Sequence, residues 1–303
     1  MPLSLDDLSA KVEAGEPLSD ADVEALGSTR DIIALGMLAT AVRRTLHGTQ
    51  VTYLRVADLD VVPTFRSAAA PPDAAGEIRI FHTPDTLSAA IEIVTKAREL
   101  ARSTPLSAFC LFELSRLSEG LPVVLSALKQ AGLELITQAP VDRLKDPEQA
   151  LEALTDAGLQ LARLTVDETP ERPWTAICRD VAAYQTRLGS IRAFAPLPRT
   201  IDSTQPTTGY EDVRRVALSR LLASNVETIQ VDWALYGPKL AQVALTFGAD
   251  DIDSVSADED DSKGHRRSPI EEIHRSIRSA GFEPVERDGN FVHRPSSLVH
   301  RQS

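Results

Sequence analysis

Hydrophobic and polar positions repeat with two different periods along the chain, and the two periods separate strands from helices. Short apolar or alternating runs are typical of strands, whereas apolar residues three or four positions apart are typical of helices. After residue 48 the two kinds of run alternate, and helical runs end in glycine, as at Gly132 and Gly158. The predicted strands are 51–56, 77–82, 107–113, 133–138, 159–166, 190–197, 228–233 and 250–256. Eight strand–helix units in roughly 250 residues predict an α/β fold, the TIM-type (β/α)8 barrel.

The two ends of the chain lie outside this pattern. Residues 1–48 have helical spacing, with Ser19 and Asp22 placed as a capping box, and predict an N-terminal helical segment that packs on the barrel. The barrel is predicted over 49–290, with a C-terminal helix and a short extended segment at its end. Residues 291–303 are expected to be disordered. Residues 61–76 contain three prolines and are expected to form a protease-sensitive surface loop.

Composition restricts the partners more than the fold. The net charge of −12 disfavours nucleic acids and anionic membranes as partners, because both are polyanions. No apolar run approaches the roughly 20 residues that span a bilayer, and no signal peptide is recognisable, so a cytoplasmic location is expected. The acidic run 250–261 offers oxygen ligands for a hard cation, but a solvated acidic loop is the preferred interpretation.

Cysteine spacing and glycine motifs narrow the chemistry further. Cys110 and Cys178 are far apart and belong to no CxxC or CxxxCxxC pattern, so neither a zinc site nor a thiolate-held cluster is expected, and no metal ligand is assigned. Their apolar neighbours indicate buried side chains. The chain contains no GxGxxG or GxxxxGK[ST] sequence, which removes the common nucleotide-binding classes.

Two blocks of sequence carry a family resemblance. One is VALSRLLASNVETIQVDWALYGPKLAQVALTFGADDIDSV, followed by EEIHRSIRSAGFEPVERD; the other is LATAVRRTLHGTQVTYLRVADLD. The matching positions are Arg220, Trp233, Gly237, Ala241, Gln242, Phe247, Gly248, Asp251 and Pro284 to Asp288. In these blocks the chain resembles the radical S-adenosylmethionine enzymes of menaquinone biosynthesis, of the aminofutalosine synthase and dehypoxanthine futalosine cyclase type. The resemblance implies a radical-SAM-like barrel.

The departures from the family imply lost cofactors. In the family, the first strand leads into a CxxxCxxC loop whose thiolates hold a [4Fe–4S] cluster, and the cluster binds S-adenosylmethionine. Here the corresponding stretch, LDVVPTFRSAAAPPDAAG, contains no cysteine, and FHTPDT and TQAPVDR replace two glycine-rich turns. The resemblance therefore predicts that the iron–sulfur cluster and S-adenosylmethionine are both lost, and that the chain alone is no working radical enzyme.

Candidate ligand contacts lie where predicted strands end, because barrel ligands bind at the C-terminal ends of the strands. These candidates are His82, Glu113, Asp232, Trp233, Asp251 and Asp253. Glu113 also matches a glutamate of the family, so it is the expected contact for the ribose hydroxyls of a nucleoside-like ligand. The alternative for each residue is a structural role, as a helix N-cap or in a loop ion pair. No catalytic residue is assigned.

Three functions remain open at this point. The first is a cluster-less homologue that acts as a noncatalytic partner or as a binder of a futalosine-type intermediate. Its protein partner would be a cluster-bearing paralogue or a second copy of the chain. The second is a non-radical enzyme that acts on a related nucleoside or aromatic acid. The third is an interaction scaffold without a ligand. The sequence does not decide whether the protein is an enzyme.

Overall fold

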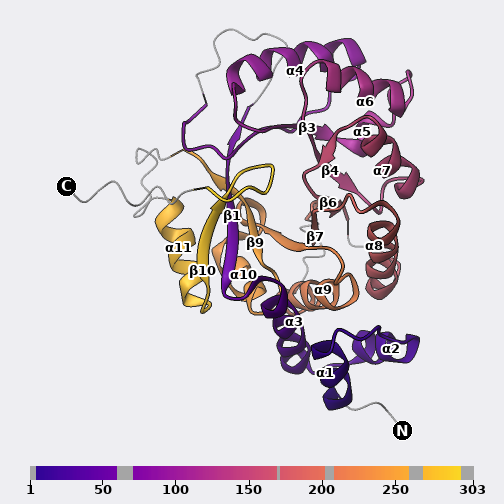
Figure 1. Ribbon diagram of the computed structural model, residues 1–303, viewed down its shortest axis with the longest axis vertical. Helices are drawn as coiled ribbons and strands as arrows, with labels where there is room; N and C mark the ends of the chain where they lie inside the picture. Colours follow the sequence, from indigo (N-terminus) through magenta and orange to yellow (C-terminus); the bar gives the residue numbers. More distant parts are fainter. Residues whose placement is uncertain (1–4, 60–70, 169–170, 202–207, 259–268, 295–303) are drawn as a thin grey trace, which may run out of the picture.

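Eight parallel strands close into a barrel, and helices surround it (Figure 1). This arrangement is seen in a computed structural model that describes residues 5–59, 71–168, 171–201, 208–258 and 269–294. The strands follow the order β1-β2-β3-β4-β6-β7-β8-β9, and β9 pairs back with β1. The predicted (β/α)8 barrel is confirmed. The barrel strands are β1 (Gln50–Asp58), β2 (Glu77–Ile80), β3 (Leu106–Cys110), β4 (Leu135–Pro140), β6 (Leu164–Val166), β7 (Ala193–Pro198), β8 (Thr228–Asp232) and β9 (Asp251–Ser256).

The helices outside the barrel begin at polar caps that the sequence supplies. Thr86 and Asp146 accept a backbone N–H at the starts of α4 and α7, and the left-handed Gly189 ends α8. These helices bury the outward-facing apolar side chains of the strands. The helices that follow β2 are α4 (Leu87–Ala101), α5 (Leu111–Leu114), α6 (Leu121–Gln130), α7 (Pro147–Asp156), α8 (Trp174–Leu188), α9 (Gly209–Leu222), α10 (Trp233–Leu245) and α11 (Pro269–Ser279).

Three helices precede the barrel: α1 (Leu5–Glu13), α2 (Asp20–Ser28) and α3 (Ile32–His47). The predicted capping box at the start of α2 is present, with Ser19 and Asp22 bonded reciprocally. Leu35 and Leu38 of α3 join Leu218 of α9 in a small hydrophobic cluster, so the segment packs on the outer helices of the barrel.

A tenth strand, β10 (Glu283–Arg287), pairs with the first half of β1, from Gln50 to Leu54. The second half of β1 pairs with the short β2. Strand β10 therefore pairs with the part of β1 that β2 does not reach. Beyond β10, Arg294 donates to the Glu286 carboxylate. The rest of the expected disordered tail, 295–303, and most of the expected loop 61–76 lie outside the described residues.

Two predicted strands are shorter than their sequence pattern. The run 107–113 leaves the sheet at Cys110, after Phe109 takes a positive φ of 67°, and residues 111–114 form the short helix α5. The run 159–166 divides into β5 (Gln160–Leu161), which pairs with β4, and β6, with a bend between them. Glu113 therefore lies on a helix rather than at the end of a strand.

Candidate functional site

The inner surface of the barrel is charged, and the alternation of side chains along the strands explains why. Successive residues of a strand point to opposite faces of the sheet. On β2, Ile78 and Ile80 belong to the hydrophobic core, whereas Glu77 and Arg79 are buried outside that core. Since the helices cover the outer face, these charged side chains lie inside the barrel. Buried charges must be paired, so the interior is held together by ion pairs.

The middle of the interior is organised around Asp253. Its Oδ1 accepts from Arg79 Nη2 at 3.0 Å and its Oδ2 from Arg79 Nη1 at 3.1 Å, and Arg163 Nη1 bonds to the same carboxylate. Arg79 also donates through Nε to Glu77 Oε1 at 2.7 Å. Burial alone would raise the pKa of Asp253, but Arg163 and Arg79 hold that pKa far below its usual range.

A second carboxylate, Asp251, closes the lower part of the interior. Arg287 of β10 donates to it through Nε at 2.7 Å and Nη2 at 2.8 Å. Thr52 Oγ1 and Gln230 Nε2 donate to the same carboxylate at 2.5 Å and 2.8 Å. All three partners come from strands, so Asp251 joins β9 to β1, β8 and β10 and has a structural role.

The upper part of the interior reaches the mouth of the barrel through Asp232 and Arg199. Asp232 Oδ1 accepts the Leu235 N–H at 2.9 Å and caps α10, while Oδ2 accepts the Ser254 hydroxyl at 2.9 Å and pairs with Arg199. Burial would raise the pKa of Asp232, but Arg199 keeps it below its usual value. The Arg199 side chain is 17% exposed, so this pair is reachable from solvent.

One carboxyl at the mouth, that of Asp58, has a raised pKa, whereas those of Asp232 and Asp253 are lowered. Asp58 is the last residue of β1 and lies near Arg79 and Asp253. Partial burial raises the pKa of Asp58; Arg79 opposes this shift, and Asp253 adds to it. A carboxyl with a raised pKa at a barrel mouth is a candidate proton acceptor.

The six predicted site residues separate into two groups. Asp232, Asp251 and Asp253 are buried inside the barrel and paired with arginines. His82 and Glu113 are exposed in the segments after β2 and β3, and Trp233 is the half-buried first residue of α10. Asp251 opens β9 and Asp253 lies in the middle of that strand, whereas the other four lie at or just after the C-terminal ends of strands, where the mouth opens.

The interpretation of 250–261 as a solvated acidic loop is wrong for its first part. Asp250, Asp251 and Asp253 are buried, because β9 turns alternate carboxylates into the barrel and Asp250 pairs with Arg220 on α9. Asp258 is exposed, and residues 259–261 lie outside the described chain. Within the described ranges, no group of three or more His, Cys, Asp or Glu side chains is placed to hold a metal ion.

The sequence analysis missed the arginines that pair with these carboxylates. Arg79, Arg163 and Arg199 all contact predicted candidates, yet none was singled out. A signal was present in the alternation of polar residues within the strands, as at Glu77 and Arg79. A strand covered by helices should be apolar on both faces, so a polar residue at every second position marks a polar interior.

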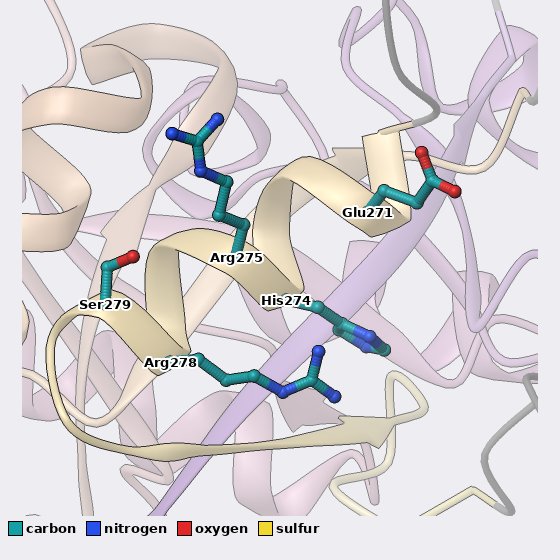
Figure 2. Close-up of a pocket in the computed structure, with 5 residues that line it drawn as sticks. All are labelled: Glu271, His274, Arg275, Arg278 and Ser279. Carbon is teal, nitrogen blue, oxygen red and sulfur yellow. The ribbon is translucent and has the colours of Figure 1, made fainter.

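A pocket of about 470 Å³ lies on α11, outside the barrel, and is lined by Glu271, His274, Arg275, Arg278 and Ser279 (Figure 2). Figure 2 shows His274 and Arg278 extending from the same side of the helix. Burial, Arg278 and Arg55 lower the pKa of His274 to about 4, so its ring is neutral near pH 7. Its Nε2 lies 2.8 Å from the Tyr53 hydroxyl, which donates to Glu286 at 3.2 Å. His274 thus belongs to the packing of α11 on the barrel.

Known structures share this architecture. The crystal structure of methylornithine synthase (PylB) superposes with a TM-score of 0.66 at 13% identity, covering 93% of this chain and 97% of that chain. The [FeFe]-hydrogenase maturase HydG gives a TM-score of 0.66 at 10% identity, covering 93% of this chain and 75% of that one. The fold of the protein is therefore the (β/α)8 barrel that these structures share.

Sequence comparison specifies the family. Residues 195–299 match the model of the CofH/MqnC C-terminal region. Aminodeoxyfutalosine synthase of Streptomyces coelicolor is 39% identical over 94 residues, which is 29% of this chain and 24% of that protein. Cyclic dehypoxanthine futalosine synthase of the same organism is 34% identical over 125 residues, 38% of this chain and 31% of that protein. An archaeal relative, 5-amino-6-(D-ribitylamino)uracil–L-tyrosine 4-hydroxyphenyl transferase 2 of Methanosarcina barkeri, is 42% identical over 89 residues, 27% of this chain and 23% of that protein.

These matches confirm the predicted resemblance: the C-terminal third of the chain matches the CofH/MqnC C-terminal region and is similar to two enzymes named for futalosine synthesis. The chain spans between about a quarter and a third of the length of the curated relatives it matches. No helix in the described ranges is long and apolar enough to cross a membrane.

The expectation that both cofactors are lost is contradicted by this relationship. The relatives and the structural neighbours are radical S-adenosylmethionine enzymes, which use an iron–sulfur cluster and S-adenosylmethionine. Whether this chain's own cysteines could hold such a cluster is a separate question. Its two cysteines, Cys110 on β3 and Cys178 on α8, are buried, and burial raises the pKa of both thiols. These two buried and separate thiols do not fit a thiolate-held cluster.

Proposed function

We propose that the protein binds a futalosine-type intermediate in the mouth of its barrel, as the partner of an enzyme of the same pathway. The observation that carries the proposal is the continuous set of charged side chains from the centre of the barrel to its mouth. Binding at the C-terminal ends of the strands is the rule for this fold. The kinship of the C-terminal third with futalosine-pathway enzymes supports the choice of ligand.

The pairing of the interior carboxylates favours binding over proton transfer. A general base works best when its pKa lies near the working pH. Asp232 and Asp253 have lowered pKa values and carry arginine partners, so both are ionised and compensated. Fixed, paired charges of this kind orient a polar ligand without taking its protons.

Glu113 remains the proposed contact for the ribose hydroxyls, because it is exposed just after β3. A carboxylate that accepts two hydroxyls makes charge-assisted bonds. Glu113→Gln is expected to weaken binding of futalosine about tenfold. Glu119→Gln, which removes an equally exposed carboxylate on the following loop, is the matched control and should leave the affinity unchanged.

Isothermal titration calorimetry with futalosine, adenosine and S-adenosylmethionine tests the proposal. Saturable binding of futalosine that is weakened by Glu113→Gln but not by Glu119→Gln supports it. If Glu113→Gln binds futalosine as tightly as wild type does, Glu113 does not contact the ligand. If none of the three compounds binds, the proposal fails and the protein is a scaffold.

Asp58 supports the second candidate, an enzyme that catalyses a non-radical step. Its raised pKa and its place at the end of β1 suit a proton acceptor. In that case the protein would convert the bound intermediate, and Asp58→Asn would abolish conversion while leaving binding intact. Incubation of the protein with futalosine, followed by chromatography of the products, separates the enzyme from the binder.

A further inference from the structure

Two of the three nitrogens of one buried guanidinium group inside the barrel have no hydrogen-bond partner among the described residues. Arg163 is 1% exposed, and its Nη1 bonds to Asp253. Its Nε and Nη2 are buried and have no hydrogen-bond partner among the described residues. Two unsatisfied donors on a buried charged group are costly, so an acceptor is expected to meet them in the working protein.

The two free nitrogens form one recognition edge. In a guanidinium group, Nε–H and one Nη2–H point in parallel, and this edge matches the two oxygens of a carboxylate. Because Asp253 occupies Nη1, it leaves this edge of Arg163 available. Lysine offers no such edge, since its ammonium group is a single point charge.

Two other buried arginines inside the barrel, Arg79 and Arg287, are more fully hydrogen-bonded. Arg79 is bonded to Glu77, Asp253 and Ser254, and Arg287 is bonded to Asp251 and the Asp288 carbonyl. The unmatched edge thus distinguishes Arg163 from Arg79 and Arg287, the other two fully buried arginines described inside the barrel.

A second unsatisfied group lies two residues further along the chain. Arg163 immediately precedes β6, and its bond to Asp253 places its side chain inside the barrel. Thr165 lies in β6 between Leu164 and Val166 of the hydrophobic core, so its side chain also points inward. Its hydroxyl oxygen is buried and has no partner among the described residues. A hydroxyl next to a free guanidinium edge adds a donor for an anionic ligand, toward the C-terminal end of the strand.

We propose that Arg163 anchors a carboxylate of the bound ligand through Nε and Nη2, with the Thr165 hydroxyl beside it. The inference rests on the proposed function and specifies its ligand as a small molecule that carries a carboxylate. The local charge agrees with this. Burial and the neighbouring Arg79 lower the pKa of Arg163 to about 10, and an incoming carboxylate would relieve both effects.

The first experiment compares futalosine with its methyl ester, in which the carboxylate is neutral. Wild type is expected to bind the acid at least about tenfold more tightly than the ester. Arg163→Lys keeps the charge and a contact to Asp253 but loses the edge, so it should bind the two compounds equally. Arg187→Lys, an exposed position on α8 paired with Glu148, is the matched control and should retain the preference. Thr165→Val, which leaves every ion pair intact, should reduce the preference by about threefold.

The second experiment does not need futalosine. Sodium formate is titrated into the nitrogen-15-labelled protein, and arginine Nε–H resonances are followed by NMR. The resonance that Arg163→Lys removes is expected to shift and saturate. A saturating formate shift without futalosine binding would contradict the proposed function. It would still support Arg163 as a carboxylate-binding residue. No formate shift, together with an unchanged acid preference in Arg163→Lys, would show that only water meets this edge and would overturn the inference.

Discussion

Asp253 compensates two buried guanidinium groups at once, those of Arg79 and Arg163. Asp253→Asn would leave Arg163 without a carboxylate partner and Arg79 with Glu77 alone, both in a buried site. Removing one partner of a buried ion pair typically lowers the free energy of unfolding by about 3–5 kcal/mol. Urea denaturation should show a loss of this size. Asp156→Asn, at an exposed position of α7, should change stability by less than about 0.5 kcal/mol.

The same carboxylate gives the expected pH dependence. Although burial opposes the shift, Arg163 and Arg79 hold the folded pKa of Asp253 below its unfolded value of about 3.9. Its contribution to stability is therefore complete above pH 4 (about the unfolded pKa) and declines as pH falls toward the folded pKa. The difference between wild type and Asp253→Asn should shrink in acid. An equal difference at pH 3 and pH 7 (about one unit below and three above that value) would contradict the ion-pair account.

Residue contacts were predictable from sequence only where they are local. Ser19 and Asp22 are three positions apart, and their capping box was predicted and confirmed. Arg79 and Asp253 are separated by 174 positions, so no periodicity in a single strand indicates that they meet. The carboxylates were singled out because strands end near them, whereas their arginine partners required the closed barrel.

Among the elements, helix α3 packs closely on the barrel because Gly36 has no side chain to meet the Phe247 ring. A Cβ at Gly36 would lie 2.7 Å from Phe247 Cε1 and 2.8 Å from Cδ1. Alanine favours a helix by about 1 kcal/mol over glycine, but such a clash costs about 1–3 kcal/mol. Gly36→Ala is therefore expected to lower the free energy of unfolding by up to about 2 kcal/mol.

The double variant Gly36→Ala with Phe247→Leu removes the ring and should regain most of the loss caused by the alanine. Gly209→Ala, at the first position of α9 with no atom within 4 Å, is the control and should be neutral or slightly stabilising. Thermal melts check all three. A stabilised Gly36→Ala would show that α3 moves freely from Phe247.

The elements were mostly predictable because their signals are periodic and capped. The exceptions have physical causes in the backbone. Phe109 takes a left-handed conformation that ends β3, and the apolar run through residues 107–113 gave no sign of it. The extended segment after Gly281 was expected, but its pairing with β1 as β10 depends on the short β2 leaving that edge open.

For the whole molecule, the (β/α)8 barrel followed from eight strand–helix repeats, but the nature of its interior did not. Such barrels are commonly filled by branched apolar side chains. Here Asp251, Asp253 and their arginines fill the interior instead, and the described residues leave Arg163 with an unmatched edge. The sequence thus indicated candidate residues at the mouth of the barrel, but it did not indicate the arginines that pair with the buried carboxylates.

A crystal structure of the protein with bound futalosine would locate the ligand. We expect electron density for it at the C-terminal ends of the strands, with its carboxylate on Nε and Nη2 of Arg163 and its ribose near Glu113. Density on the α11 pocket of Figure 2, or a ligand-free mouth at saturating futalosine, would contradict this expectation.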